Sequence, residues 1–201
     1  MTYSPSNVVG DYFEDYACRV FDLDRNDPKL VGNVPDLMAK DGSFFVECKA
    51  ASFKNGGVIK EEQLFRFNKD ISVRRFYVFV FHPICENMHQ NYPTARRLRN
   101  AFDRSSGQFQ TYLFPLSIVL AHFDKTHKRI KYPGMTYEDK FCQLRYRPAQ
   151  KIFQLDSGEF FRLGLDPKQY QQRELHERVH ILTRQGHLED KLLGSFHPEF
   201  L

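Results

Sequence analysis

Apolar residues recur at helical spacing over the first segment of the chain, residues 5–21. Val9, Phe13, Tyr16 and Val20 return every three or four positions, so they would share one face of a helix. Aspartates occupy much of the remaining surface of that helix. The pattern predicts an amphipathic helix that packs its apolar side on a protein core.

The pair Asp41-Gly42 is a strong signal for a hairpin turn, after which the chain would return as a strand. Residues 43–51 predict a strand in which Phe45, Glu47 and Lys49 project on one side, and the residues between them on the other. This strand therefore places a carboxylate and an ammonium group next to each other on one face of a sheet.

Further along, residues 60–71 predict a helix, and the aromatic and β-branched run 75–82 predicts a buried central strand. A basic helix over 93–104 follows. The order of elements predicts an α/β fold, with a central mixed β-sheet flanked by helices. Because no repeat or Pro/Gly/Ser linker interrupts the chain, we expect one domain. Its core would span residues 1–90, and residues 91–201 would form a C-terminal α+β elaboration of that domain.

The composition excludes several classes of protein. The chain has 201 residues, 15% aromatic and 27% charged, with no apolar run near the roughly 20 residues that span a bilayer. The first residues lack the basic and apolar regions of a secretory signal. Four widely spaced cysteines form no CxxC pair, which favours free thiols. We therefore expect an intracellular, cytoplasmic protein without a disulfide scaffold. The cysteines are Cys18, Cys48, Cys85 and Cys142.

The net charge of +4 combines zones of opposite sign. Residues 1–50 carry 5 basic and 9 acidic side chains, whereas residues 51–104 carry 10 and 5, and residues 105–150 carry 7 and 3. A basic middle favours contact with nucleic-acid phosphates, although a solvated surface would show the same counts. No motif for reading bases is present. The candidate nucleic-acid-binding residues are Lys60, Arg66, Arg96, Arg97 and Arg99.

The acidic first quarter holds the candidate chemistry. Asp36 follows Pro35, and the turn after it would return the chain so that Asp36 approaches Glu47. Two carboxylates at one point raise each other's pKa unless a cation compensates them. Mg²⁺ binds through one or two carboxylates, its own waters and substrate phosphate, and Lys49 would lie beside it. The alternative is a surface hairpin on which Glu47 and Lys49 form an exposed ion pair.

The chain resembles the PD-(D/E)xK nuclease superfamily in one signature, Pro35-Asp36 followed by Glu47-Cys48-Lys49. The archaeal Holliday-junction resolvases and restriction-endonuclease-like nucleases are among the members of this superfamily. The resemblance covers roughly residues 8–83. It implies a restriction-endonuclease-like core in which Asp36 and Glu47 bind Mg²⁺, with Mn²⁺ able to substitute, and Lys49 assists the attacking water.

Two further residues fit the same resemblance. A glutamate on a preceding helix is common in the family, and Glu14, beside small residues, would complete the metal site. Gln63, on the helix after the lysine strand, would position water or phosphate. The function implied is metal-dependent endonuclease cleavage of branched or structured DNA by a homodimer, in DNA recombination or repair. The alternatives are a restriction-type or virus-type repair nuclease, and a nucleic-acid-binding module that has lost turnover.

A second motif, HExxH at residues 176–180, predicts a zinc site if His176 and His180 share a helix face, with Glu177 as general base. The longer zinc-peptidase spacing would require glycine and histidine where Thr183 and Gly186 stand. A zinc metallopeptidase is therefore the weakest of the alternatives.

Overall fold

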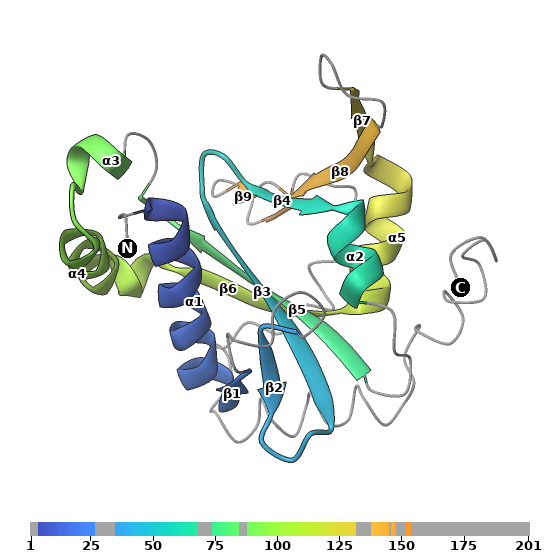
Figure 1. Cartoon of the computed structure of the whole chain (residues 1–201), viewed down its shortest axis with the longest axis horizontal. Coiled ribbons are helices and arrows are strands. Elements are labelled where there is room, and N and C mark those ends of the chain that lie inside the picture. The colour runs from blue at the N-terminus through green and yellow to red at the C-terminus, as the bar shows by residue number, and fades with distance from the viewer. Residues whose placement is uncertain are drawn as a thin grey trace.

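A five-stranded mixed sheet forms the centre of the molecule in the computed structural model, in the order β1-β2-β3-β5-β6 (Figure 1). Strands β3 and β5 run parallel, and the other neighbours are antiparallel. The expected α/β fold with a mixed central sheet is thereby confirmed. The strands are β1 Leu23–Arg25, β2 Leu37–Ala39, β3 Phe44–Ser52, β5 Arg74–His82 and β6 Gln110–Pro115. The structure describes residues 4–26, 35–67, 74–84, 88–131, 138–144, 146–147 and 152–153.

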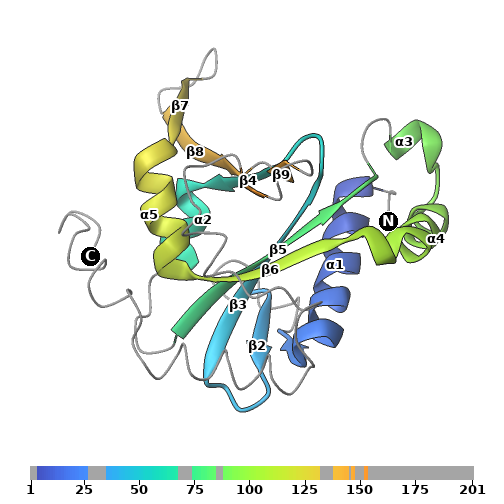
Figure 2. The same cartoon turned by 180° about the vertical axis from the view of Figure 1, so that it is seen from behind.

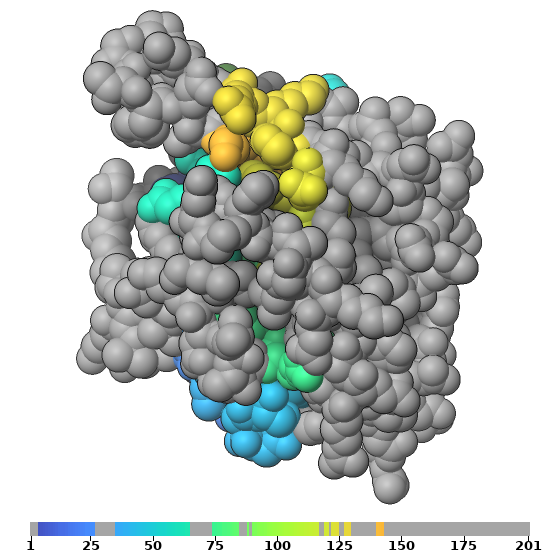
Figure 3. All heavy atoms as spheres, turned by 90° about the vertical axis from the view of Figure 1, so that its right-hand side faces the viewer, coloured from blue at the N-terminus to red at the C-terminus, as the bar shows by residue number. Residues whose placement is uncertain are grey.

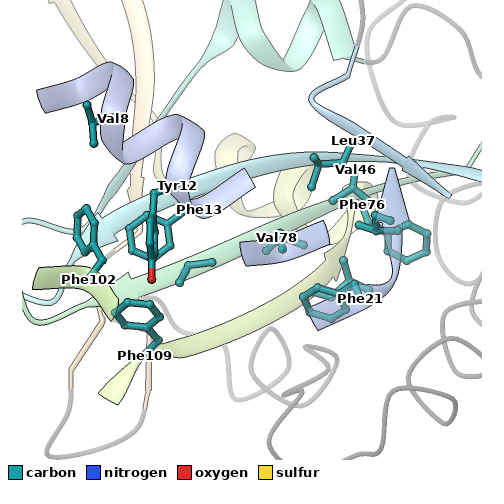
Figure 4. Packing of buried hydrophobic residues seen from close by; sticks show 14 of the residues in the cluster. Val8, Tyr12, Phe13, Phe21, Leu37, Val46, Phe76, Val78, Phe102 and Phe109 are labelled. Carbon is teal, nitrogen blue, oxygen red and sulfur yellow. The ribbon is translucent and has the colours of Figure 1, made fainter. Parts of the chain in front are cut away.

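Helices α1 (Pro5–Phe21) and α4 (Ala95–Ser105) cover one face of this sheet (Figure 1). Their apolar sides and the strands beneath them form the first core, which is rich in packed aromatic rings (Figure 4). Phe13 lies at its centre, within 5.2 Å of the Tyr12, Phe102 and Phe109 ring centroids. This packing holds both helices firmly against the sheet.

The opposite face carries a second core beneath α2 (Glu61–Phe67) and α5 (Leu116–Thr126) (Figure 2). A second sheet of three antiparallel strands lies on this side, in the order β4-β8-β7. Helix α5 and the β2–β3 turn both reach the surface in the view of Figure 3. The remaining elements are β4 Gly57–Lys60, β7 Lys128–Lys131, β8 Glu138–Leu144, β9 Tyr146–Arg147, β10 Ile152–Phe153, α3 Met88–Asn91 and the 3₁₀ turn Ser106–Gln108.

Strand β3 divides its side chains between the two cores as the alternation predicts. Phe44 and Val46 are buried in the first core and Cys48 packs against it, whereas Phe45 packs against the second. Glu47 and Lys49 therefore project toward the side of the second core. Cys48 points away from them and is part of the hydrophobic packing, as expected.

Most of the helices and strands described within residues 4–131 begin and end close to the predicted positions. Examples are the helix 5–21 and the central strand near 75–82. The apolar segment 109–122 contains two elements, because β6 ends at Pro115 and α5 begins at the next residue. Strand β6 joins the central sheet, so this sheet uses residues on both sides of position 90.

Among the described residues, no helix is long and apolar enough to cross a membrane.

Candidate functional site

The candidate site lies where the edge of β3 becomes accessible beyond its short neighbour β2, whose pairing with β3 reaches only Val46. Asp36 stands just before β2, and its Oδ2 accepts a hydrogen bond of 2.9 Å from the backbone N–H of Cys48. Asn26 fixes the approach to Asp36, since its side-chain amide donates to the Pro35 carbonyl at 2.6 Å. Its backbone N–H donates to the Asp36 carbonyl at 3.1 Å. The Pro-Asp turn is thus tied to both neighbouring strands.

Glu47 and Lys49 form an ion pair of 2.6 Å between Oε1 and Nζ, and their side chains are only 15% and 18% exposed. The prediction that these residues are adjacent is confirmed, whereas the alternative of an exposed surface pair is wrong. In the parallel register Glu47 lies opposite Tyr77 and Lys49 opposite Phe79, both of which belong to the second core. Because this apolar layer excludes water, the attraction between the two charges is poorly screened.

Glu14 approaches from α1, on the other face of the sheet, and its Oε2 accepts a hydrogen bond of 2.5 Å from Arg25. The Arg25 guanidinium also binds Asp11 at 3.1 Å and Asp15 at 3.0 Å. Arg99 of α4 extends this network, with nitrogens 3.8–3.9 Å from the same two aspartates. The sequence pattern did not identify Arg25, although a lone arginine after an acidic helix is a signal that could have found it.

The three carboxylates interact electrostatically around the β3 edge. Burial raises the pKa of Glu14, the negative charge of Asp36 raises it further, and Arg25 opposes both effects. Burial likewise raises the pKa of Glu47, with Lys49 opposing and Asp36 reinforcing the shift. Burial alone would lower the pKa of Lys49, but the carboxylates of Glu47 and Asp36 outweigh it and the pKa is raised. Lys49 is therefore a cation at neutral pH.

These residues fit a hard divalent cation in the type of their donors, because all three present carboxylate oxygens. Their arrangement is more open than that of a preformed metal site. In the described parts of the chain, no three His, Cys, Asp or Glu side chains are grouped closely enough to hold a metal ion. Lys49 and Arg25 instead supply the positive charge at Glu47 and Glu14.

The structure records a different contact for Gln63. Its side-chain oxygen accepts a hydrogen bond of 3.3 Å from the Lys60 backbone N–H, which caps the start of α2. A role for Gln63 in positioning water therefore stays a prediction. Arg96 and Arg97 are exposed on α4, as is Lys60 at the end of β4. The side chain of Arg66 and the HExxH motif at 176–180 lie outside the described residues.

Three cysteines in the described ranges carry free thiols. They are Cys18, Cys48 and Cys142. Burial raises the pKa of Cys48 well above its ordinary value, which favours the unreactive thiol form. Cys85 lies outside the described residues.

No family model matches this chain, and none of the curated proteins is significantly similar to it. The function of the chain must therefore be inferred from its own residues and from the geometry of the β3 edge.

Proposed function

We propose that this protein is a Mg²⁺-dependent endonuclease that hydrolyses DNA phosphodiester bonds on a restriction-endonuclease-like core. One observation carries the proposal: Asp36, the Glu47–Lys49 pair and Glu14 approach the same edge of β3 from three different elements. Helix, turn and strand must fold together to bring these charges near one another. The burial and the raised pKa of Glu47 and Glu14 are typical of functional sites.

Each residue has a distinct role in this proposal. Asp36 and Glu47 would hold Mg²⁺, with Glu14 completing or supporting the set. When bound, the ion would acidify a water molecule and offset charge on the phosphate. Lys49, held as a cation by its two acidic neighbours, is suited to donate a hydrogen bond to the attacking water or to a phosphate oxygen as negative charge develops. Its raised pKa disfavours a role as the general base.

The substrate class comes from the resemblance to the Holliday-junction resolvases, which favours branched or structured DNA and a homodimer. Restriction-type and virus-type repair nucleases are the alternative enzymes. A non-catalytic nucleic-acid-binding module is the second candidate. One observation favours it: Lys49 and Arg25 already neutralise Glu47 and Glu14.

The test is cleavage of four DNA substrates by the purified protein in Mg²⁺ or Mn²⁺: a four-way junction, a flap, a linear duplex and a single strand. Asp36→Asn removes the charge but keeps an oxygen that can accept the Cys48 N–H, so the variant should fold and fail to cut. Asp41→Asn is the matched control, because Asp41 is exposed in the β2–β3 turn and binds Ser43. Equal cleavage by wild type and Asp36→Asn would refute the proposal. Binding without cleavage by the wild type would favour the non-catalytic module.

A further inference from the structure

We propose that the outer face of α4 is the surface on which the protein holds the sugar-phosphate backbone of a DNA duplex, through Arg96, Arg97 and Arg104. This inference rests on the proposed function, and it names a contact surface for that substrate. It also separates the arginines of α4 into two groups with different tasks.

Three arginines of α4 lie on one side of the helix. At 3.6 residues per turn, Arg96, Arg97, Asn100 and Arg104 fall within a sector of about 100°. All four are exposed, whereas Leu98 is fully buried on the other side. The three arginines therefore share one polar face of α4.

The charge on this polar face of α4 is positive. In the part of the chain that the structure describes, Arg96, Arg97 and Arg104 form no ion pair with a carboxylate. The acidic residue of α4, Asp103, accepts a hydrogen bond of 2.8 Å from the Tyr12 hydroxyl of α1. Because no carboxylate in the described ranges forms an ion pair with these three arginines, a bound polyanion would compensate their charge.

Arg99 belongs to a different group. It is 39% exposed, and it lies 3.9 Å from Asp11 and 3.8 Å from Asp15, the two aspartates that Arg25 also binds. This network joins α4 to α1, the helix that carries Glu14. We therefore assign Arg99 to holding α4 in place beside the candidate site, and the other three arginines to DNA.

The chemistry of the face favours a nucleic-acid backbone over a protein partner. A stable protein interface needs buried apolar anchors, and the exposed sector of α4 offers arginines and an asparagine instead. The guanidinium fork matches phosphate oxygens in a bidentate way. Positions 96 to 104 span about 12 Å, a length over which one DNA strand presents three to four phosphates at about 3.4 Å each along the axis. Phosphate contacts position the duplex without reading its sequence.

The experiment measures binding of the full-length protein to a fluorescent 30-base-pair duplex in EDTA, between 50 and 300 mM KCl. We expect R96Q/R97Q/R104Q to reduce the slope of log K against log[KCl] by about 2.7, because each lost phosphate contact removes about 0.9. At 0.1 M salt this corresponds to a loss of affinity of about 500-fold. Circular dichroism checks that the variant is folded.

The matched control, R19Q/K54Q/K128Q, removes the same net charge from three exposed positions on separate elements. A slope change below about 1 in the α4 variant, or an equal change in the control, would overturn the proposal. The proposal would also be overturned if polyglutamate displaced the labelled duplex as effectively, per unit of charge, as unlabelled DNA does.

Cleavage by the wild type in Mg²⁺ is measured separately. If the wild type cuts DNA and the α4 variant keeps the salt slope of the wild type, only the proposed DNA-binding surface on α4 is refuted. If the wild type binds DNA through α4 and never cuts it, only the proposed nuclease activity is refuted.

Discussion

His82 ends the central strand β5 inside the first core, where its side chain makes the fold sensitive to acid. The residue is 1% exposed, its ring stacks on Phe13 at 5.0 Å between centroids, and Phe102 meets it edge-on at 5.1 Å. Burial lowers the pKa of His82 from 6.5 to about 4. A hydrogen bond with the backbone of Ile84 raises the pKa, but this effect is smaller than that of burial. The folded protein therefore keeps this imidazole neutral under conditions in which the unfolded chain protonates it.

The sign and size of the effect come from this difference in pKa. Above pH 6.5 the ring is neutral in both states and adds no pH dependence. As the pH falls from 6.5 toward 4, the unfolded state binds a proton that the folded state does not, so stability is lost. Each unit of pKa difference corresponds to about 1.4 kcal/mol, which gives a loss of about 3 kcal/mol between pH 7.5 and pH 4.

Urea unfolding at pH 7.5, 6.0, 5.0 and 4.0 measures this loss. We expect His82→Phe, which keeps a ring against Phe13 but cannot bind a proton, to remove about 3 kcal/mol of the acid-dependent loss seen in the wild type. His127→Phe is the control, because His127 is half-buried at the end of α5 and stacks on Phe123. If His82→Phe and the wild type lose the same free energy of unfolding between pH 7.5 and pH 4, His82 is not the source of the acid sensitivity.

Two further predictions concern the Glu47–Lys49 pair and the cap of α4. Lys49→Met should abolish cleavage and also destabilise the fold by about 3 kcal/mol, since it leaves Glu47 buried without its partner. A fall in Tm of about 6–12 °C by calorimetry would report this, and Lys49→Met/Glu47→Gln should recover much of it. A single variant as stable as the wild type would contradict a buried pair. Thr94 caps α4, with its hydroxyl oxygen 3.3 Å from the Arg97 N–H. Thr94→Ala should therefore cost about 1 kcal/mol in urea unfolding, while Thr94→Ser should cost less; equal losses would argue against the cap.

Local patterns predicted the elements whose signals lie within one segment. Helix α1 begins at Pro5 and ends at Phe21 as the spacing indicates, and β3 alternates between two environments because its pleat has a period of two. The helix face was predicted less well. Val9 and Tyr16 only flank the first core, whereas Val8 and Tyr12 are buried in it, because α4 covers a neighbouring part of α1.

Features that depend on distant partners were not predictable in this way. The pairing of β4 with β8 joins residues about 80 positions apart, and no local signal at Gly57–Lys60 indicates it. Arg25 was missed for a similar reason, since its role depends on three acids of a helix that it meets only after folding. By contrast, the proximity of Asp36 to Glu47 resulted from a short hairpin, in which the turn determines which residues meet.

The parallel register of β3 and β5 places uncharged rings next to the charged pair at the candidate site. Tyr77 and Phe79 belong to a packed aromatic layer that also includes Phe81 and Phe114. This layer sets the local dielectric, so it controls how strongly Glu47 and Lys49 attract each other. A substitution that lets water into the layer would weaken the pair without touching a charged residue. Variants that impair the site should therefore also arise among the phenylalanines of the second core, where inspection of the charged residues alone would overlook them.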